Sequence, residues 1–488
     1  MKLEELIEYL DYKDLVYFKS VEVSGISYNS KTTKQGDIFI CLVGENTDGH
    51  EYAQMAIDNG AVALLVERPV DIKIPQVVVR NTRHKIADIA DRFYSRPSLG
   101  LNLIGITGTN GKTTVTHLMQ KIFEENNQKC ALIGTLGYKL SSNGEYRDAK
   151  HTTPQAPELQ AMLRMIKDVE KIDNVVMEVS SHALEQNRVG GCRFDGAILT
   201  NLTQDHLDYH ITMENYFEAK SILFKNLKEG NFAVINIDDQ YGEKFLNLVP
   251  EDVNIYTYGI KNNADIMAKD IDFSLNGAEF TLVTPEKECR VSLHMNGMFS
   301  VYNVLAAITA SLAIGIDVEV ALKALEQIKG VAGRFEVVAK KPLVIVDYAH
   351  TPDGLENVLN SAREITPKEG HLICLFGCGG DRDATKRPKM GAIAEKIADK
   401  IVITSDNPRS EDPQQIITDI IAGLKSVNPD KVSVEIDRGR AIELLKSISH
   451  NNDVIVIAGK GHEDYQILKD RTIHFDDREE ARKIFEGV

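Results

Sequence analysis

The chain has 488 residues, of which 56 are Lys or Arg and 72 are Asp or Glu, so its formal net charge is -16. At roughly 100 to 200 residues per domain, this length predicts about three domains. The negative charge disfavours a nucleic-acid partner, which would require phosphate neutralisation, and no apolar run approaches the ~20 residues that span a membrane.

The first section, residues 1–98, predicts a small α/β domain. Its opening stretch, MKLEELIEYLDYKDLVYF, carries acids through an apolar run and lacks a basic leader. We therefore expect an amphipathic helix there and a cytoplasmic protein. Apolar runs at residues 38–43, 61–66 and 76–79 follow, separated by turns, as short strands would be.

The second section, residues 99–333, predicts a largely parallel sheet. Buried-strand candidates recur at residues 103–106, 175–179, 197–199 and 233–237, and helical patterns lie between most of them. This alternation is typical of a nucleotide-binding domain in which ligands meet the carboxyl ends of the strands.

A glycine-rich loop, GITGTNGKTTVTHLMQ at residues 105–120, follows the first of these strands. Gly108 and Gly111 can adopt backbone angles closed to other residues, so N–H groups can point at a polyphosphate, while Lys112 supplies charge and Thr113 a hydroxyl for magnesium. Ile106 stands where the common phosphate-loop pattern has its first glycine. A ligand-free strand–turn–helix junction is the alternative, but Gly-Lys-Thr-Thr after a buried strand favours a nucleotide site.

Two further segments offer metal ligands. Glu178 ends an apolar run, where its carboxylate could reach a metal held by Thr113. The segment TNLTQDHLDYHITMENYFEAKSILF, residues 200–224, contains His206 and His210 beside acids, with Lys220 on an expected amphipathic helix. Taken alone, the acids and histidines could be solvated, and Lys220 could be a surface lysine, because an ammonium has no lone pair for a metal.

The third section, residues 334–488, has strand candidates at residues 343–346, 371–376, 400–404 and 453–458 that alternate with helical patterns. This pattern predicts a second doubly wound α/β domain.

Together these motifs resemble the Mur ligases of peptidoglycan synthesis, and the resemblance covers nearly the whole chain. The shared strings are TGTNGKTT at 107–114, EVSSH at 178–182, TNLTQDH at 200–206 and YFEAK at 216–220. Downstream, GRFE at 333–336, DYAHTPDGLENVL at 347–359, DNPRSEDP at 406–413 and GKGHEDYQ at 459–466 are similar to the tripeptide-forming members. The resemblance implies a small N-terminal α/β uridine-binding domain (1–98), a central P-loop ATPase-like parallel-sheet domain (99–333) and a C-terminal Rossmann-like amino-acid-binding domain (334–488).

The reaction that this resemblance implies is ATP-driven amide formation. The γ-carboxylate of D-glutamate in UDP-N-acetylmuramoyl-L-alanyl-D-glutamate takes the γ-phosphoryl group of ATP, and the amino group of meso-diaminopimelate attacks the resulting acyl phosphate. Two Mg²⁺ ions are implied, together with CO₂ or bicarbonate that carbamylates Lys220 to N6-carboxylysine. We expect a monomer that binds these small molecules.

The resemblance also assigns site residues. Lys112, Glu178, His206 and Lys220 are implied to be catalytic, and Thr113, Glu178, His206 and carbamylated Lys220 to be metal ligands. Nucleotide contacts are implied for Gly108, Thr109, Asn110, Gly111, Lys112, Thr113, Thr114, Asn303, Arg334, Asp347 and His350. Because Arg334 and Asp347 lie in the third section, we expect the site to be complete only when the second and third domains close over ATP.

The two other substrates have their own implied contacts. For the UDP-sugar peptide these are Ser30, Thr152, Thr153, Ser180, Gln186 and Arg188. The family pattern Asp-Ser-Arg reads Asn29, Ser30 and Lys31 here, so the contacts that flank Ser30 differ. For diaminopimelate they are Arg382, Asp406, Asn407, Pro408, Arg409, Gly459 and Glu463. The guanidinium of Arg409 could grip the distal carboxylate bidentately, although Asp-Asn-Pro-Arg alone is also an ordinary turn.

Other functions remain open from sequence. A lysine-adding relative would differ in only a few selector residues such as Arg409, whereas a D-alanyl-D-alanine-adding relative would not need the DNPR string. Folylpoly-γ-glutamate synthetase shares the loop style but usually lacks a uridine domain. A nucleotide-regulated scaffold protein would be expected to have lost at least one of Lys112, Glu178, His206 and Lys220, and all four are present.

Overall fold

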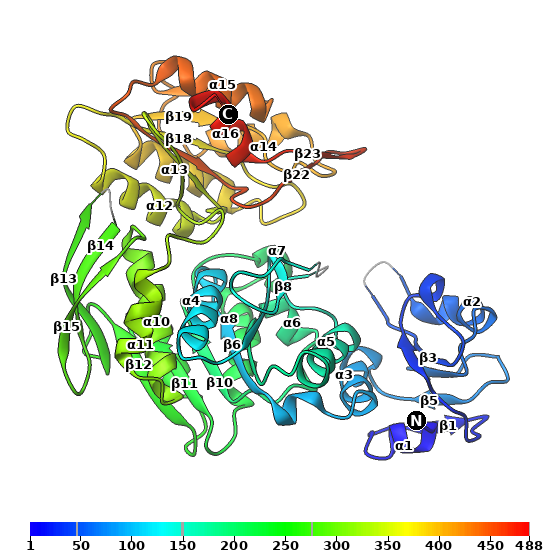
Figure 1. Ribbon diagram of the computed structural model, residues 1–488. Helices are drawn as coiled ribbons and strands as arrows, with labels where there is room; N and C mark the ends of the chain where they lie inside the picture. The colour runs from blue at the N-terminus through cyan, green and yellow to red at the C-terminus, as the bar shows by residue number, and fades with distance from the viewer. Residues whose placement is uncertain (45–46, 148–150, 275–276, 488) are drawn as a thin grey trace.

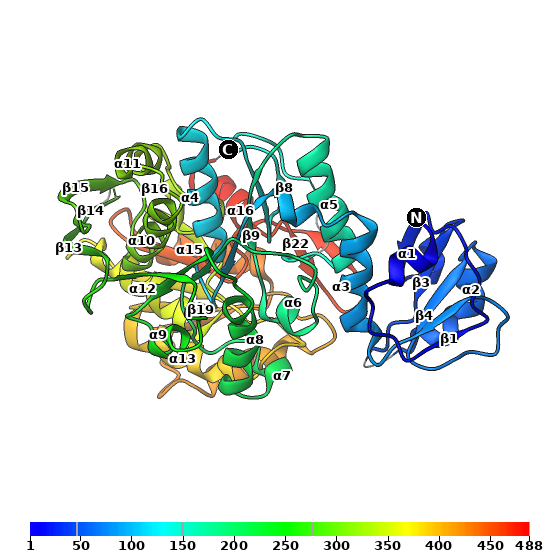
Figure 2. The same ribbon diagram turned by 90° about the horizontal axis from the view of Figure 1, so that it is seen from below.

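The computed structural model describes residues 1–44, 47–147, 151–274 and 277–487. Residues 45 and 46, which interrupt the N-terminal section, lie outside the described residues. Three large sheets succeed one another along the described part of the chain, and each falls within one of the three expected sections. Figure 1 shows the resulting arrangement of three bodies. Figure 2 shows the N-terminal body at one end of the molecule, where its helix α3 (Thr82–Phe93) lies next to α5 (Ala156–Asp168) of the central body. The expected three-domain α/β fold is confirmed.

The N-terminal body is a five-stranded sheet of order β1-β5-β4-β3-β2, parallel except for the β1–β5 pair. Apolar clusters on its two faces pack under the helices. Its elements are α1 (Leu3–Ile7), β1 (Asp14–Val16), β2 (Gly25–Ser27), β3 (Asp37–Ile40), α2 (Ala53–Asp58), β4 (Ala63–Val66), β5 (Gln76–Val78) and α3 (Thr82–Phe93).

The prediction of a helix over the whole opening stretch is wrong beyond Ile7. The chain instead forms β1, in which Leu15 lies opposite Val77 of β5. Edge pairing along the sheet satisfies the backbone hydrogen bonds of this segment, and this tertiary interaction outweighs the helical periodicity of the sequence.

The central body is a ten-stranded sheet of order β15-β14-β13-β12-β11-β10-β6-β9-β7-β8, parallel from β7 to β13. Side chains of β6 alternate between its two apolar layers, with Leu103 in one and Ile104 and Ile106 in the other. Its first elements are β6 (Asn102–Thr107), α4 (Lys112–Glu125), β7 (Cys130–Gly134), β8 (Gly137–Lys139), α5 (Ala156–Asp168), β9 (Asn174–Glu178), α6 (Ser181–Glu185), β10 (Gly196–Leu199), α7 (Leu207–His210) and α8 (Met213–Lys225).

The second half of this body adds an antiparallel extension to the parallel sheet. Strands β13 to β15 form a meander at the sheet edge, visible at the left of Figure 1, and α10 and α11 pack beside α4. The elements are β11 (Phe232–Asn236), α9 (Gly242–Leu246), β12 (Asn254–Gly259), β13 (Ile266–Ser274), β14 (Gly277–Val283), β15 (Glu288–Leu293), α10 (Met298–Ala313) and α11 (Val318–Glu326).

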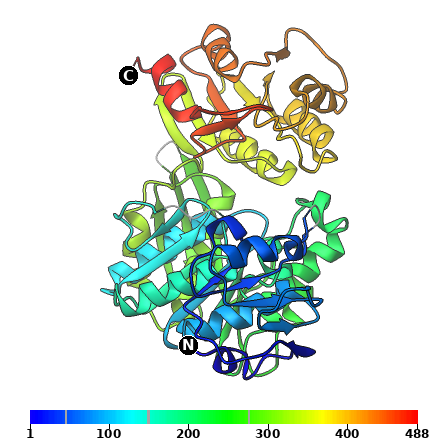
Figure 3. The same cartoon turned by 90° about the vertical axis from the view of Figure 1, so that its right-hand side faces the viewer.

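The C-terminal body lies above the central one in Figure 3. Its six-stranded sheet has the order β16-β17-β21-β18-β19-β20, with only β16 antiparallel, and its two faces carry separate apolar clusters. The elements are β16 (Glu336–Lys340), β17 (Leu343–Asp347), α12 (Pro352–Glu364), β18 (Leu372–Phe376), α13 (Lys386–Ile397), β19 (Lys400–Ile403), α14 (Pro413–Ile421), β20 (Val432–Val434), α15 (Arg438–Ile448), β21 (Val454–Ala458), the hairpin β22 (Tyr465–Ile467) and β23 (Thr472–His474), and α16 (Asp477–Phe485).

Candidate active site

The glycine-rich loop joins the carboxyl end of β6 to α4. Gly111 has φ +87° and Gly108 has φ +150°, both in the region that favours glycine. A Cβ atom on Gly111 would lie 2.3 Å from Asn303 Oδ1, and one on Gly108 would lie 1.8 Å from Thr200 Oγ1. The unusual glycine spacing therefore has a local cause, because the loop is packed tightly against neighbouring segments at both positions. The free N–H groups at the start of α4 face the same end of the sheet.

Two lysines converge on this loop. The Nζ atom of Lys112 donates to the carbonyl oxygens of Gly108 and Thr109, both at 2.9 Å, and Lys220 Nζ donates to the same Gly108 oxygen at 2.7 Å. Lys220 lies on α8 and is only 1 % exposed, so it is not a surface lysine. Burial, reinforced by the charge of Lys112, holds the pKa of Lys220 well below its usual range. Burial therefore disfavours the charged ammonium form of Lys220.

Glu178 ends β9 and is buried. Its carboxylate accepts hydrogen bonds from Thr135, one from the backbone N–H at 2.9 Å and one from the hydroxyl at 3.0 Å. Its charge also acts on Lys112, where it opposes the lowering of the lysine pKa by burial. Glu178 therefore lies near the phosphate loop, as expected, with Thr135 as a partner that the sequence did not indicate.

The residues expected to bind the sugar peptide form one network around β9, with the exception of Ser30. The Thr153 hydroxyl donates to the Glu178 carbonyl at 2.8 Å and contacts the Ser180 hydroxyl at 3.4 Å. Arg188 donates to the Thr153 carbonyl at 3.1 Å and to Gln186 Oε1 at 2.8 Å. Thr152 joins through Thr135, at 3.2 Å between the two hydroxyls.

Ser30 lies in the N-terminal body, where its hydroxyl contacts Met55 Sδ at 3.3 Å and its carbonyl accepts from Asn59. None of its described hydrogen bonds joins it to that network. Asn29 caps the short helix that holds Ser30 by accepting from the Lys31 N–H at 3.1 Å. Asparagine replaces the family's aspartate at residue 29, and its side chain can still cap this helix. Lys31, which replaces the family's arginine, is exposed.

Asp205 and His206 follow β10. His206 has φ +55°, and its backbone N–H donates to its neighbour's carboxylate, Asp205 Oδ1, at 2.9 Å. The His206 ring is partly exposed and packs edge-on against His182, with 4.9 Å between ring centroids. Desolvation holds the pKa of His206 below its usual range, which favours a neutral imidazole with a lone pair for a metal. His210 is buried and contacts Ser181 and Glu185, so the solvated alternative is wrong for this second histidine.

A cavity of about 250 Å³ lies between the central and C-terminal bodies beside the loop. Of the residues expected to contact the nucleotide, six line it: Asn110, Gly111, Thr114, Asn303, Arg334 and Asp347. Contacts cross between the bodies here, since Arg334 donates to Thr113 Oγ1 at 3.2 Å and Asn110 donates to Asp353 Oδ2 at 2.8 Å. His350 lies outside this lining and faces Asp205 instead, at 3.7 Å.

The expected amino-acid selector surrounds the carboxyl ends of β19 and β21. The Asn407 side chain donates to Glu463 Oε2 at 2.9 Å and accepts from the Ile467 N–H at 2.8 Å. Arg409 has φ +52° and donates to the Gly380 carbonyl at 2.8 Å. The carbonyl of Pro408, between them, accepts from the Glu411 N–H at 3.0 Å.

Two acids sit close together in this selector. A Cβ atom on Gly459 would lie 2.6 Å from Asp406 Oδ2, so a larger residue there would displace the carboxylate. Burial and the neighbouring Asp406 raise the pKa of Glu463, and Lys460 Nζ, at 3.1 Å, offsets part of that rise. Arg382 stays exposed and donates to the Asp381 carbonyl at 2.8 Å. Lys460 is buried and was not anticipated from the sequence.

Among the described residues, no group of three or more His, Cys, Asp and Glu side chains is spaced to hold a metal ion, and no helix is long and apolar enough to cross a membrane. The donors beside the loop nevertheless fit magnesium, because a buried carboxylate and a hydroxyl are hard oxygen ligands. The unmodified ammonium of Lys220 does not fit, whereas a carbamate on that nitrogen would add two oxygens.

Comparisons with known proteins agree with this geometry. Three family models match the chain in succession: Mur ligase family, catalytic domain, at residues 22–94; Mur ligase middle domain at 106–311; and Mur ligase, glutamate ligase domain, at 333–461. A relative from Syntrophomonas wolfei, named UDP-N-acetylmuramoyl-L-alanyl-D-glutamate 2,6-diaminopimelate ligase, is 45% identical and covers 100% of this chain and 99% of its own. The similarly named relative from Bacillus cereus is 44% identical with the same coverage.

Solved structures are similar too. One, titled as a UDP-N-acetylmuramoyl-L-alanyl-D-glutamate 2,6-diaminopimelate ligase, is 35% identical, covers 95% of each chain and has a TM-score of 0.67. A folylpolyglutamate synthase from Mycobacterium tuberculosis has a TM-score of 0.66 at 16% identity, covering 83% of this chain and 95% of its own, which indicates a shared fold.

Proposed function

This chain belongs to the Mur ligase family, and from that premise we propose that it is the ATP-dependent, ADP-forming ligase that adds meso-diaminopimelate to UDP-N-acetylmuramoyl-L-alanyl-D-glutamate. The new amide joins the γ-carboxylate of D-glutamate to an amino group of diaminopimelate. The product is a precursor of peptidoglycan.

One observation supports this proposal above the others: a continuous path of contacts links the phosphate loop to the amino-acid selector. Arg334, which donates to Thr113, lies over the Tyr348 ring at 4.4 Å from its centroid. The Tyr348 hydroxyl contacts Glu463 Oε1 at 3.5 Å, and Glu463 is held by Asn407. A ligase needs this adjacency, because the phosphorylated carboxylate and the attacking amine must meet.

The chain's own residues account for phosphoryl transfer as follows. Lys112, whose Nζ atom lies at the Gly108 and Thr109 carbonyl oxygens of the loop, would bind the β- and γ-phosphates. The glycine-rich loop supplies N–H donors, and Arg334 adds positive charge from the C-terminal body. Two magnesium ions, held by Thr113, Glu178, His206 and carbamylated Lys220, would neutralise charge on the transferring phosphoryl group.

Carbamylation of Lys220 follows from the same proposal. The neutral amine attacks CO₂, a C–N bond forms, and one proton leaves, which gives a carbamate anion. The carbamate anion would then lie beside the Lys112 cation at the Gly108 oxygen. This change places opposite charges next to each other and supplies oxygen ligands.

Amide formation follows at the other end of the path. Arg409 and Arg382 bind carboxylates of diaminopimelate, and Glu463 binds its distal ammonium, which orients the reacting amine. That amine attacks the acyl phosphate, the C–N bond forms, phosphate leaves with the C–O bond electrons, and the amine loses a proton. L-lysine lacks the distal carboxylate that Arg409 would bind, so we place lysine second as the added amino acid.

An isotope-transfer experiment tests this function. If the γ-carboxylate of the dipeptide substrate carries ¹⁸O, the acyl phosphate route must move one labelled oxygen into the released phosphate. We expect labelled phosphate by mass spectrometry, in an amount equal to the amide product. Amide formation without label in the phosphate would exclude the acyl phosphate, and a reaction mixture without diaminopimelate is the control for simple ATP hydrolysis.

A further inference from the structure

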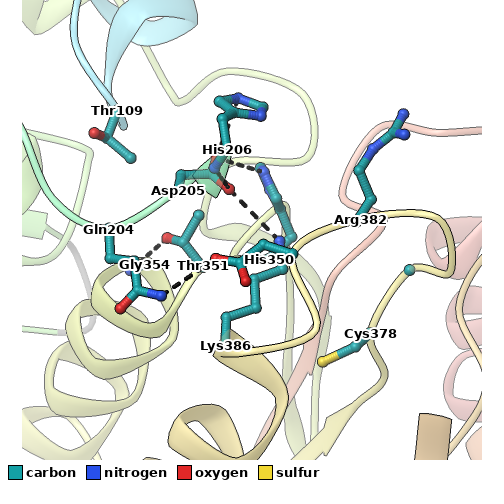
Figure 4. A network of polar contacts seen from close by, with 12 residues as sticks. Thr109, Gln204, Asp205, His206, His350, Thr351, Gly354, Cys378, Arg382 and Lys386 are labelled. Atoms are coloured by element: carbon teal, nitrogen blue, oxygen red, sulfur yellow. Dashed lines mark hydrogen bonds and ion pairs between the residues drawn. The ribbon is translucent and has the colours of Figure 1, made fainter. Parts of the chain in front are cut away.

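The amino end of α13 faces the loop that carries Asp205 and His206, although the two segments belong to different bodies. Lys386 Nζ lies 3.6 Å from Asp205 Oδ1. Next to it, Gln204 donates to Asp383 Oδ2 at 3.2 Å and to the Thr385 hydroxyl at 3.0 Å, and accepts from Lys389. Figure 4 shows Lys386 and His350 approaching Asp205 together.

The placement of positive charge in this helix is unusual. The first turn of α13 carries Lys386, Arg387 and Lys389 and no acid, although the positive end of the helix dipole disfavours cations there. Arg387 is neutralised within its own body by Glu411 and Asp419, each at 2.8 Å. The two lysines instead reach across to residues 204 and 205. Helix stability does not explain these lysines, whereas a cross-body role does.

Asp205 is the natural partner for such a role. It is 4 % exposed and Lys386 is 5 % exposed, so both charges are removed from water when the bodies are in contact. A buried carboxylate deprived of its cation is strongly destabilising, so this pair favours the docked arrangement of the two bodies.

From this geometry we propose that Lys386 is a positioning residue that docks the C-terminal body on the central body through Asp205. Docking also fixes Asp205, whose carboxylate holds the His206 N–H and lies 3.3 Å from the His206 ring. The inference rests on the proposed function, because docking completes the ligase site by bringing Arg334 and the selector to the phosphate loop.

Small-angle X-ray scattering of the full chain, with Mg²⁺ and a non-hydrolysable ATP analogue, tests the docking role. Lys386→Met keeps the side-chain length but leaves Asp205 unpaired. We expect a larger radius of gyration than for the wild type, an unchanged thermal unfolding midpoint, and a fall in kcat of about 30-fold or more. Lys386→Arg, which keeps the charge, should stay compact and retain most of the activity.

Two further variants complete the test. Lys396→Met removes an exposed lysine from the last turn of the same helix and should match the wild type in scattering and rate. In the double variant Asp205→Asn/Lys386→Met no buried charge is left unpaired, so its radius of gyration should return toward the wild-type value. An unchanged radius in Lys386→Met, or a double variant as expanded as the single one, would overturn the docking role. If the proposed function were wrong, the wild type would instead have the compact radius of gyration but would form no amide product.

Discussion

Replacement of Lys220 by alanine is expected to lower kcat for amide formation by about 10³-fold or more at any bicarbonate concentration. The lysine nitrogen is the buried atom on which the carbamate would form, and alanine removes the anion that completes the charge pattern around the transferring phosphoryl group. The measurement is phosphate release at saturating substrates. Short carboxylates need not restore the rate, because the site is closed around the side chain.

The matched control for this prediction is Lys225→Ala, at the exposed end of the same helix, where the lysine pairs with Glu218 at 2.6 Å. That variant should retain the wild-type rate. Carbon-13 NMR with labelled bicarbonate supplies a second readout, since the wild type should show a carbamate signal that Lys220→Ala lacks. A Lys220→Ala variant with wild-type turnover would exclude the carbamate role.

Replacement of Arg409 by alanine should raise the KM for diaminopimelate by about 10- to 100-fold, the loss expected for charge-assisted hydrogen bonds to a carboxylate. The KM for ATP should change by less than about threefold, because Arg409 is held beside Gly380 and Ile467, on the selector side of the site. Initial rates with each substrate varied in turn give both constants.

The lysine variant at this position sharpens the prediction. Arg409→Lys keeps the charge but loses the planar fork, so its KM for diaminopimelate should lie between those of the wild type and the alanine variant. Arg471→Ala, at an exposed arginine near the β22–β23 turn, is the control and should leave both constants unchanged. An unchanged KM for diaminopimelate in Arg409→Ala would remove Arg409 from the selector.

Much of the fold could be predicted because its parallel strands are buried on both faces. Such strands appear in the sequence as short apolar runs. The runs around Leu103, Val175, Ile345 and Val456 all form interior strands of their sheets. The edges could not be predicted in the same way. Strand β1 and the meander β13 to β15 have mixed burial, and their pairing depends on neighbours far along the chain.

The candidate site divides along similar lines. The phosphate loop at Gly108 could be found because its local spacing carries its chemistry. The selector at Asn407 was implied only by the resemblance of its continuous motif to the Mur ligases. Thr135, Lys460 and Lys386 were missed because each acts on a partner brought near by the fold, for example Lys386 on Asp205. For Lys386 the sequence did offer a signal, which is the cluster of cations at the start of α13. Cations at a helix N-terminus are unfavourable unless a partner outside the helix neutralises them.

The most direct test of the account is phosphate release from ATP by the wild-type chain with Mg²⁺ and UDP-N-acetylmuramoyl-L-alanyl-D-glutamate, comparing meso-diaminopimelate with L-lysine as the sole added amino acid. We expect rapid release with diaminopimelate, little with lysine, and none when the nucleotide-sugar dipeptide is omitted. Rapid release with lysine would keep the ligase but contradict the selector built around Arg409. No phosphate release with either amino acid would contradict the proposed reaction itself.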